Sequence, residues 1–175
     1  MSSKPTIAIF GGTQGVGKQC LEQALTLGYT CRVLARNPSA LNSLSEQYAS
    51  LLTIIKGDVL NAADVKQVLQ ISQGNWCTLI ISAVGGNQNE STTSLCETGV
   101  RNVAKCLEEN VMDNGGQRTR FILVSSAGLN DDRDAPWFFK RIIKPYFLNY
   151  IYNDLNQAEL IVHDLARKLA NTFEY

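Results

Sequence analysis

TIAIFGGTQGVGK, residues 6–18, is the stretch of sequence that decides the fold. A run of β-branched and apolar residues from Thr6 to Phe10 stops at two glycines, and a helical pattern begins at about Gly15. A dinucleotide fingerprint requires this order of strand, glycine turn and helix. The helix then points free N–H groups and the positive end of its dipole at the phosphates. The stretch therefore predicts a phosphate-binding loop.

Three glycines in this loop each have a separate physical task. Gly11 permits a tight exit from the strand, Gly15 lets the backbone approach a pyrophosphate, and Gly17 lets the helix lie close on the sheet. The spacing is G-x-x-x-G-x-G rather than the commoner G-x-G-x-x-G. A loop that merely turns is the alternative, but the position between one strand and one helix favours nucleotide binding.

Composition places the chain among ordinary globular proteins. Its 175 residues fit one domain, 1–175, with 45% hydrophobic and 18% charged residues. The formal net charge of zero argues against binding to nucleic acid or to a membrane surface. No apolar run approaches the ~20 residues that span a bilayer, and residues 1–5 lead directly into the first strand without a signal peptide. A cytoplasmic protein is expected.

The cysteines and the single histidine argue against a metal site. The five cysteines are an odd number without a C-x-x-C pair, which predicts reduced thiols, no disulfide framework and no zinc site. His163 lies beside Asp164 in a helical pattern, where a solvated helix face is expected. We therefore predict no metal ligands.

Strands and helices alternate along the whole chain. Apolar strands are expected at residues 6–10, 30–35, 51–56, 77–82 and 121–124, and a sixth strand begins at 172–175. Helical patterns follow at residues 15–27, 39–48, 61–69, 95–111 and 153–169. Asn61 is the expected N-cap of the third helix, with Asp64 in a position like that of a capping box. This alternation predicts an α/β fold with a doubly wound parallel sheet of Rossmann type between two helix layers.

The carboxyl ends of the predicted strands bring the polar and glycine-rich segments to one crevice. These ends are Gly11–Gly17, Arg36, Asp58-Val59, Ala83–Gly86 and Ser125–Gly128. Arg36 stands where an NAD-selective site usually has an acidic residue for the ribose hydroxyls. A guanidinium suits a 2′-phosphate instead, so NADP(H) is the predicted cofactor; an exposed arginine in a turn is the alternative.

Several motifs resemble those of the atypical short-chain dehydrogenases/reductases. They are the glycine loop, Gly57-Asp58-Val59-Leu60, Leu123-Val124-Ser125-Ser126-Ala127-Gly128 and the helix at 153–169. The sequence is most similar to the NAD(P)H-binding branch that contains biliverdin reductase B (flavin reductase) and the NmrA-like proteins.

This resemblance implies roles for the matching residues. The loop Gly11, Gly12, Thr13, Gln14, Gly15 and Val16 would hold the pyrophosphate. Asp58 and Val59 would contact the adenine, and Ala83, Val84 and Gly85 would line the adenosine and nicotinamide side. Ser125 or Ser126 would lie near the nicotinamide and the substrate as catalytic candidates, although local hydrogen bonding at a strand end explains the two serines equally well.

The sequence departs from the family in two ways. No tyrosine is followed four residues later by lysine; Ile151 and Leu155 stand where that pair is expected. Family members also continue beyond the position of Tyr175, so the substrate segment is expected to be short or missing.

Two functions are compatible with these features. One is an NADPH-dependent reductase of a small conjugated acceptor, such as a flavin, quinone or tetrapyrrole, which does not require the tyrosine–lysine pair. The other is a non-catalytic NADP(H) sensor that regulates a partner protein, as the NmrA-like resemblance implies. The aromatic and basic segment 137–152 is either a substrate lid or a core helix. Oligomeric state is not predicted.

Overall fold

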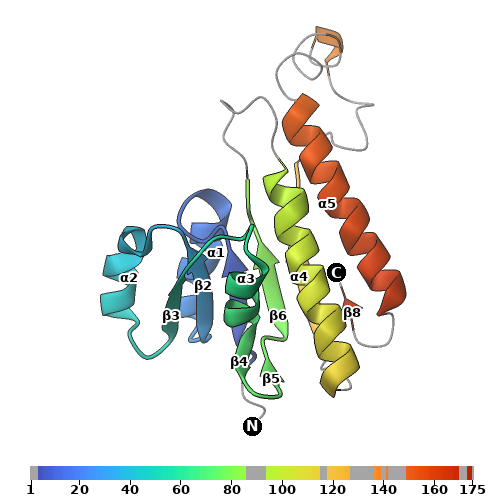
Figure 1. The fold of residues 1–175 in the computed structure, drawn as a ribbon. Helices are drawn as coiled ribbons and strands as arrows, with labels where there is room; N and C mark the ends of the chain where they lie inside the picture. Colours follow the sequence, from blue (N-terminus) through green and yellow to red (C-terminus); the bar gives the residue numbers. More distant parts are fainter. Residues whose placement is uncertain are drawn as a thin grey trace.

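A parallel six-stranded sheet carries the fold in this computed structural model, which describes residues 4–85, 94–114, 118–126, 136–138, 141, 149–169 and 173–174. The strand order is β3-β2-β1-β6-β7-β8 (Figure 1). The strands are β1 (Ile7–Phe10), β2 (Cys31–Ala35), β3 (Leu52–Lys56), β6 (Leu79–Ser82), β7 (Thr119–Leu123) and β8 (Phe173–Glu174). The order runs outward from β1 in both directions, so the topological switch point lies between β1 and β6.

Helices cover both faces of this sheet. They are α1 (Gly15–Thr26), the short 3-10 turn η1 (Pro38–Leu41), α2 (Asn42–Gln47), α3 (Ala62–Leu69), α4 (Leu95–Asn114) and α5 (Asn149–Lys168). Helices α3, α4 and α5 lie on the face toward the viewer in Figure 1, and α1 lies behind the sheet. The predicted three-layer α/β/α architecture is confirmed.

The alternation of side chains along β1 explains why this strand is apolar throughout. Ala8 and Phe10 pack in the core beneath α3, α4 and α5, whereas Ile7 and Ile9 pack in the core beneath α1 and α2. All four residues are buried. A strand covered on both faces contains no polar position, as its sequence indicated.

A two-stranded hairpin between α3 and β6 was not predicted. It consists of β4 (Gln70–Ser72) and β5 (Asn75–Trp76), and Gly74 makes the turn with φ +76°. The predicted strand at 77–82 accordingly begins only at Leu79, because the Cys77 N–H donates to the Leu69 carbonyl at the end of α3. The helix predicted at 153–169 begins earlier, at Asn149.

The start of α3 confirms one capping prediction and corrects another. Asn61 Oδ1 accepts a hydrogen bond of 2.9 Å from the Ala63 N–H, as an N-cap does. Asp64 does not bond back to Asn61, whose N–H already donates to the Asp58 carbonyl. The Asp64 carboxylate instead accepts from the Asp58 N–H at 2.9 Å and holds the loop that follows β3.

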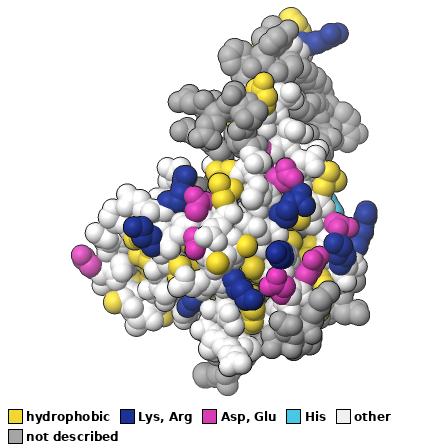
Figure 2. All heavy atoms as spheres, viewed as in Figure 1, with side chains coloured by type: hydrophobic (Ala, Val, Ile, Leu, Met, Phe, Trp, Pro, Cys, Tyr) yellow, Lys and Arg dark blue, Asp and Glu magenta, His cyan; other side chains and the backbone are white. Residues whose placement is uncertain are grey.

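Charges of both signs are interspersed on the face formed by α3, α4 and α5 (Figure 2). Ion pairs join Lys66 to Glu109 and Lys168 to Glu108, at 3.3 and 3.2 Å. His163 is exposed on α5, as predicted. None of the described helices combines the length and apolar character that crossing a bilayer requires.

Candidate cofactor cleft

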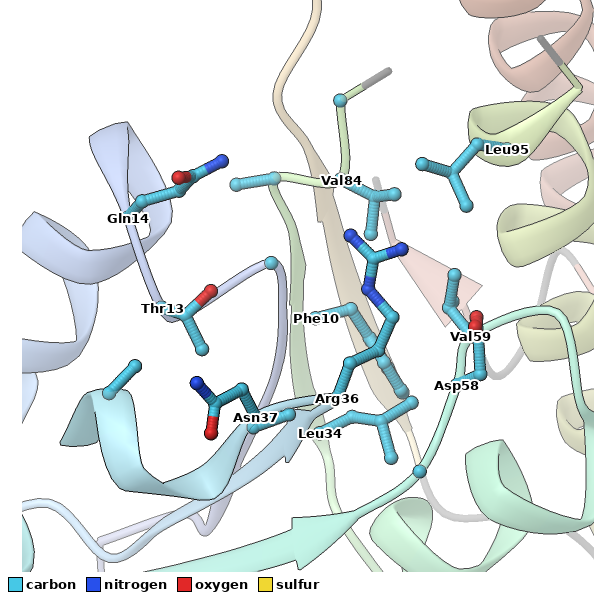
Figure 3. A pocket seen from close by; sticks show the side chains of 16 residues that line it. Phe10, Thr13, Gln14, Leu34, Arg36, Asn37, Asp58, Val59, Val84 and Leu95 are labelled. Carbon is cyan, nitrogen blue, oxygen red and sulfur yellow. The ribbon is translucent and has the colours of Figure 1, made fainter. Parts of the chain in front are cut away.

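A cavity of about 230 Å³ opens at the carboxyl edge of the sheet, where β1, β2, β3 and β6 end (Figure 3). Its walls come from five chain segments that are distant in sequence. They are Phe10, Gly11, Thr13 and Gln14; Leu34, Ala35, Arg36, Asn37 and Ala40; Gly57, Asp58 and Val59; Ala83, Val84 and Gly85; and Leu95. The cavity therefore occupies the switch point, where ligands of doubly wound sheets bind.

Two loop glycines bring the start of α1 close to the strand ends. Gly11 has φ +80°, and a Cβ there would overlap the Ala83 carbonyl. A Cβ on Gly17 would overlap the Gly11 carbonyl oxygen and lie 3.0 Å from Ala83 Cβ. Both positions are packed too tightly for a side chain, which confirms the predicted roles of these glycines in the turn and in helix–sheet packing.

Gly15 has the opposite environment. Its φ is +55°, and nothing lies within 4 Å of a Cβ built on it. The adjoining N-terminus of α1 is not capped by the Gln14 side chain, and its first turn contains no acidic residue. Open space beside uncapped N–H groups fits a bound pyrophosphate, so the loop can hold the predicted cofactor.

Arg36 and Asn37 form the cavity wall at the end of β2. The exposed Arg36 side chain extends into the cavity toward Val84 (Figure 3). Ser39 Oγ donates to Asn37 Oδ1 at 2.7 Å, and the Asn37 amide nitrogen faces Thr13. This end of the cavity therefore presents hydrogen-bond donors.

The loop after β3 is held by its own backbone and by α4. The Leu60 N–H donates to Asp58 Oδ1 at 3.0 Å. Val59 is buried, its carbonyl accepts from Asn102 Nδ2 at 2.8 Å, and a Cβ on Gly99 would lie 2.8 Å from its Cγ2. Contact with α4 thus fixes Val59 as a rigid part of the wall.

The exit of β6 is joined to α4 and α5. The Cys96 thiol donates to the Val84 carbonyl at 3.1 Å. The buried Asp154 carboxylate of α5 accepts from the backbone N–H groups of Cys96 and Glu97, at 2.9 and 2.8 Å. These bonds fix the position of the neighbouring Leu95, which lines the cavity.

Nine of the twelve residues predicted to bind cofactor line this cavity. They are Gly11, Thr13, Gln14, Arg36, Asp58, Val59, Ala83, Val84 and Gly85. The other three are placed differently: Gly12 faces Val33 and Ile9 in the core, Gly15 borders open space, and Val16 is 57% exposed. Gly86 lies outside the described residues.

The two catalytic candidates lie beyond the end of β7. Ser125 and Ser126 are exposed and do not line the cavity. Ser125 Oγ donates to Glu159 Oε1 of α5 at 2.5 Å. The hydrogen bond of Ser125 is therefore not the local one that was expected at the strand end, because its partner lies 34 residues away on α5.

Part of the predicted lid can be placed. Trp137 and Phe138 are exposed, and Tyr152 is buried. The residues at 139–140 and 142–148, the charge run at 131–134 and the motif residues Ala127 and Gly128 lie outside the described residues.

Seven wall residues were not among the predicted site residues: Phe10, Leu34, Ala35, Asn37, Ala40, Gly57 and Leu95. Asn37 and Gly57 are direct neighbours of predicted residues, so extending each strand end by one residue identifies them. Leu95 opens α4, and nothing in its local sequence indicates contact with β1 and β2.

The cysteine side chains do not line the cavity, although Cys96 supports its wall through the bond to Val84. Burial raises the pKa of Cys31 and of Cys106 to about 11, and that of Cys77 to about 12. None of the five cysteines forms a disulfide or lines the cavity. Among the described residues, no group of three or more His, Cys, Asp or Glu side chains is arranged to hold a metal ion.

Comparison with known proteins agrees with a cofactor-binding role for this cleft. Residues 11–169 match the NAD(P)H-binding family. Reductase pytE of Aspergillus terreus is 36% identical over 154 residues, which cover 77% of this chain and 58% of pytE. ChuY, an anaerobilin reductase of Escherichia coli O157:H7, is 26% identical with a TM-score of 0.65, covering 90% of this chain and 66% of ChuY.

A third protein shares the fold at lower identity. It is a short-chain dehydrogenase/reductase of Burkholderia multivorans with bound NADP, 16% identical with a TM-score of 0.72, and the match covers 97% of this chain and 75% of that one. The chain spans less than two thirds of the length of pytE and of ChuY. The family match covers most of the chain and agrees with the glycine loop, the strand order and the cavity. The chain belongs to the NAD(P)H-binding family.

Proposed function

We propose that this chain is an NADPH-dependent reductase that delivers hydride to a small conjugated acceptor without a tyrosine–lysine pair. The observation that carries the proposal is Arg36, which extends into the cavity at the end of β2. When bound, the nicotinamide supplies a hydride to the acceptor, and water supplies the proton that completes the two-electron reduction.

The choice of NADPH over NADH follows from the groups beside Arg36. A guanidinium and the Asn37 amide donate hydrogen bonds, which suits the 2′-phosphate. Asp58 is the acidic residue in the cavity wall, but it follows β3 and its Oδ1 accepts from the Leu60 N–H. No carboxylate therefore follows β2 in the place that grips the ribose hydroxyls of NAD.

The choice of a conjugated acceptor follows from the missing pair. No tyrosine in the chain has a lysine four residues later, so that proton donor is absent for a simple carbonyl. A conjugated acceptor spreads the negative charge that hydride addition creates and can take its proton from water. The reductase names of pytE and ChuY agree with this reaction class, and ChuY is named as a reductase of anaerobilin.

A non-catalytic NADP(H) sensor is the second candidate. The observation in its favour is that Ser125 and Ser126 do not line the cavity, so the described residues offer no side chain with a demonstrated role in proton transfer. A sensor and a reductase share the same cofactor cleft and differ only in turnover.

A titration with NADPH and with NADH tests the cofactor, and Arg36→Asp tests its recognition. We expect wild type to prefer NADPH and Arg36→Asp to lose about 10- to 100-fold in NADPH affinity, because a hydrogen bond to a charged group contributes about 1.5–3 kcal/mol. NADH affinity should not fall. Lys105→Asp makes the same charge change ten residues along α4 from Leu95, about 15 Å by helical rise, and should leave both affinities unchanged.

Turnover then separates the two candidates. NADPH oxidation with a panel of flavins, quinones and tetrapyrroles is expected for the reductase. Tight binding of NADPH without oxidation by any acceptor would favour the sensor. Equal affinity for NADPH and NADH would mean that Arg36 does not recognise the 2′-phosphate.

A further inference from the structure

We propose that Glu159 fixes the hydrogen-bonding direction of Ser125, so that the acceptor of this reductase carries an N–H or O–H donor beside its conjugated system. Flavins and lactam-bearing tetrapyrroles have such a donor, and simple quinones do not. The inference rests on the proposed function and narrows its substrate class.

Ser125 follows β7, which lies on the other side of β6 from β1 and β2, so it lies on the β7 side of the cleft. Leu123 pairs with Ser82, and the Val124 N–H donates to the Ser82 carbonyl at 2.8 Å. Ser125 is the next residue after Val124, and Val84, two residues after Ser82, lines the cavity. Neighbouring strands are about 4.8 Å apart, so Ser125 is within reach of a ligand that extends past Val84.

A dinucleotide spans the switch point from one side of β1 to the other. Arg36 receives the adenosine phosphate on the β2 side, so the nicotinamide and the acceptor occupy the side of β6 and β7. Ser125 is therefore on the acceptor's side of the cleft.

The Ser125 hydroxyl already donates its proton in a hydrogen bond. A serine hydroxyl has one donor and two acceptor positions. Ser125 Oγ donates to Glu159 Oε1 at 2.5 Å, the short limit for a hydroxyl–carboxylate bond. What remains toward a ligand is the oxygen's lone-pair side, which accepts hydrogen bonds and repels a carbonyl oxygen.

Glu159 is in a position to maintain this direction. It is half-buried on α5, whose Leu155, Ala158 and Val162 are packed in the core. The core contacts of these residues hold α5 in place, so the backbone of Glu159 stays opposite the end of β7. Glu159 acts through Ser125 and is a positioning residue.

A pair of flavins that differ by one donor tests the inference. Lumiflavin has an N3–H, and 3-methyllumiflavin has a methyl group there. With wild type, kcat/KM should be about tenfold or more higher for lumiflavin, since an unpaired acceptor loses about that factor or more. In Ser125→Ala the ratio should approach one.

Glu159→Gln distinguishes an effect of the hydrogen-bond direction at Ser125 from a steric effect of the flavin methyl group. The amide has nearly the same size but can both donate and accept, so the Ser125 hydroxyl can turn and the ratio should fall toward one. A steric clash with the methyl group would persist in this variant. Glu109→Gln changes a glutamate that pairs with Lys66 on the outer face, and it should keep the wild-type ratio.

Three results would contradict the inference. Equal turnover of the two flavins by wild type overturns it and leaves the reductase function intact. An unchanged ratio in Glu159→Gln, with NADPH affinity retained, also overturns it. Binding of NADPH without turnover of either flavin or of any acceptor in the panel contradicts the proposed function itself, and the inference with it.

Discussion

Gly15 and Gly17 are two residues apart, yet their surroundings differ completely. A Cβ on Gly17 would overlap the Gly11 carbonyl oxygen, and backbone cannot move aside as a flexible side chain can. Gly17→Ala should therefore lower the free energy of unfolding by about 1–3 kcal/mol, the usual cost of overpacking. Urea denaturation of the variant beside wild type measures this.

Gly15→Ala is the matched control for stability and the test for binding. Its added methyl group meets no atom within 4 Å, so the structural cost is the positive φ alone, about 1 kcal/mol. The methyl group does occupy the open space at the N-terminus of α1, and NADPH affinity should fall at least about tenfold. Wild-type affinity in Gly15→Ala would mean that the pyrophosphate lies elsewhere.

Residues whose task is local could be predicted from the sequence, and residues whose task depends on distant partners could not. The glycine loop and Arg36 are defined by the strand and helix next to them. The direction of the Ser125 hydroxyl depends on Glu159, 34 residues away, and its hydrogen bond has no counterpart in either local sequence. Asn37 falls between these two cases, because Ser39, whose hydroxyl donates to its side-chain oxygen, is only two residues away in the sequence.

At the scale of elements, α5 caps α4 across 58 residues of sequence. The buried Asp154 carboxylate accepts from two N–H groups in the first turn of α4. Asp154→Asn replaces one oxygen by a donor and leaves one N–H without its partner. We expect a loss of about 1–2 kcal/mol in the free energy of unfolding, and weaker NADPH binding because Leu95 and Val84 lose their support.

A second acidic residue on the same helix serves as control. Asp164 is exposed and pairs with Lys168 one turn later, so Asp164→Asn should leave stability and NADPH affinity unchanged within error. Equal behaviour of the two variants in urea denaturation would show that the Asp154 bonds do not hold α4 in place.

Element types could be predicted more reliably than the bonds between elements. Apolar runs and helical spacing were sufficient for the sheet strands and for α1, α3, α4 and α5. The hairpin at 70–76 was missed because its strands are short and mostly polar. The guanidinium of Arg32 donates to the carbonyls of Gln67, Val68 and Gln70 and so ties β2 to the end of α3, which no local pattern indicates.

At the scale of the whole molecule, the cleft is a product of topology. Five distant segments meet only because the strand order reverses at β1. The sequence predicted the carboxyl ends as one crevice since parallel strands end at the same edge. It could not predict Leu95, because the position of α4 over the cavity depends on Asp154 and on the close contact of Gly99 with Val59.

The core on both faces of the sheet contains thiols that titrate differently in the folded and unfolded chain. Cys31 packs on the side of α1, and Cys77 and Cys106 pack on the side of α3 and α4. Burial raises their pKa values from 9.0 to about 11 or 12. Above pH 9 the unfolded chain therefore loses these protons first. The stabilisation is complete below pH 9 and is lost as the pH rises toward 11–12, by about 1.4 kcal/mol for each thiol at pH 10.

Cys77→Ala isolates the contribution of one thiol to the pH dependence of the free energy of unfolding. The variant should be less stable than wild type at pH 7 because a buried atom is lost, and this difference should shrink by about 1.4 kcal/mol at pH 10. Val103→Ala removes buried volume without a titrating group, so its difference from wild type should not change with pH. Urea denaturation at the two pH values measures both. A constant difference for Cys77→Ala would mean that its thiol has the same pKa in the folded and unfolded chain.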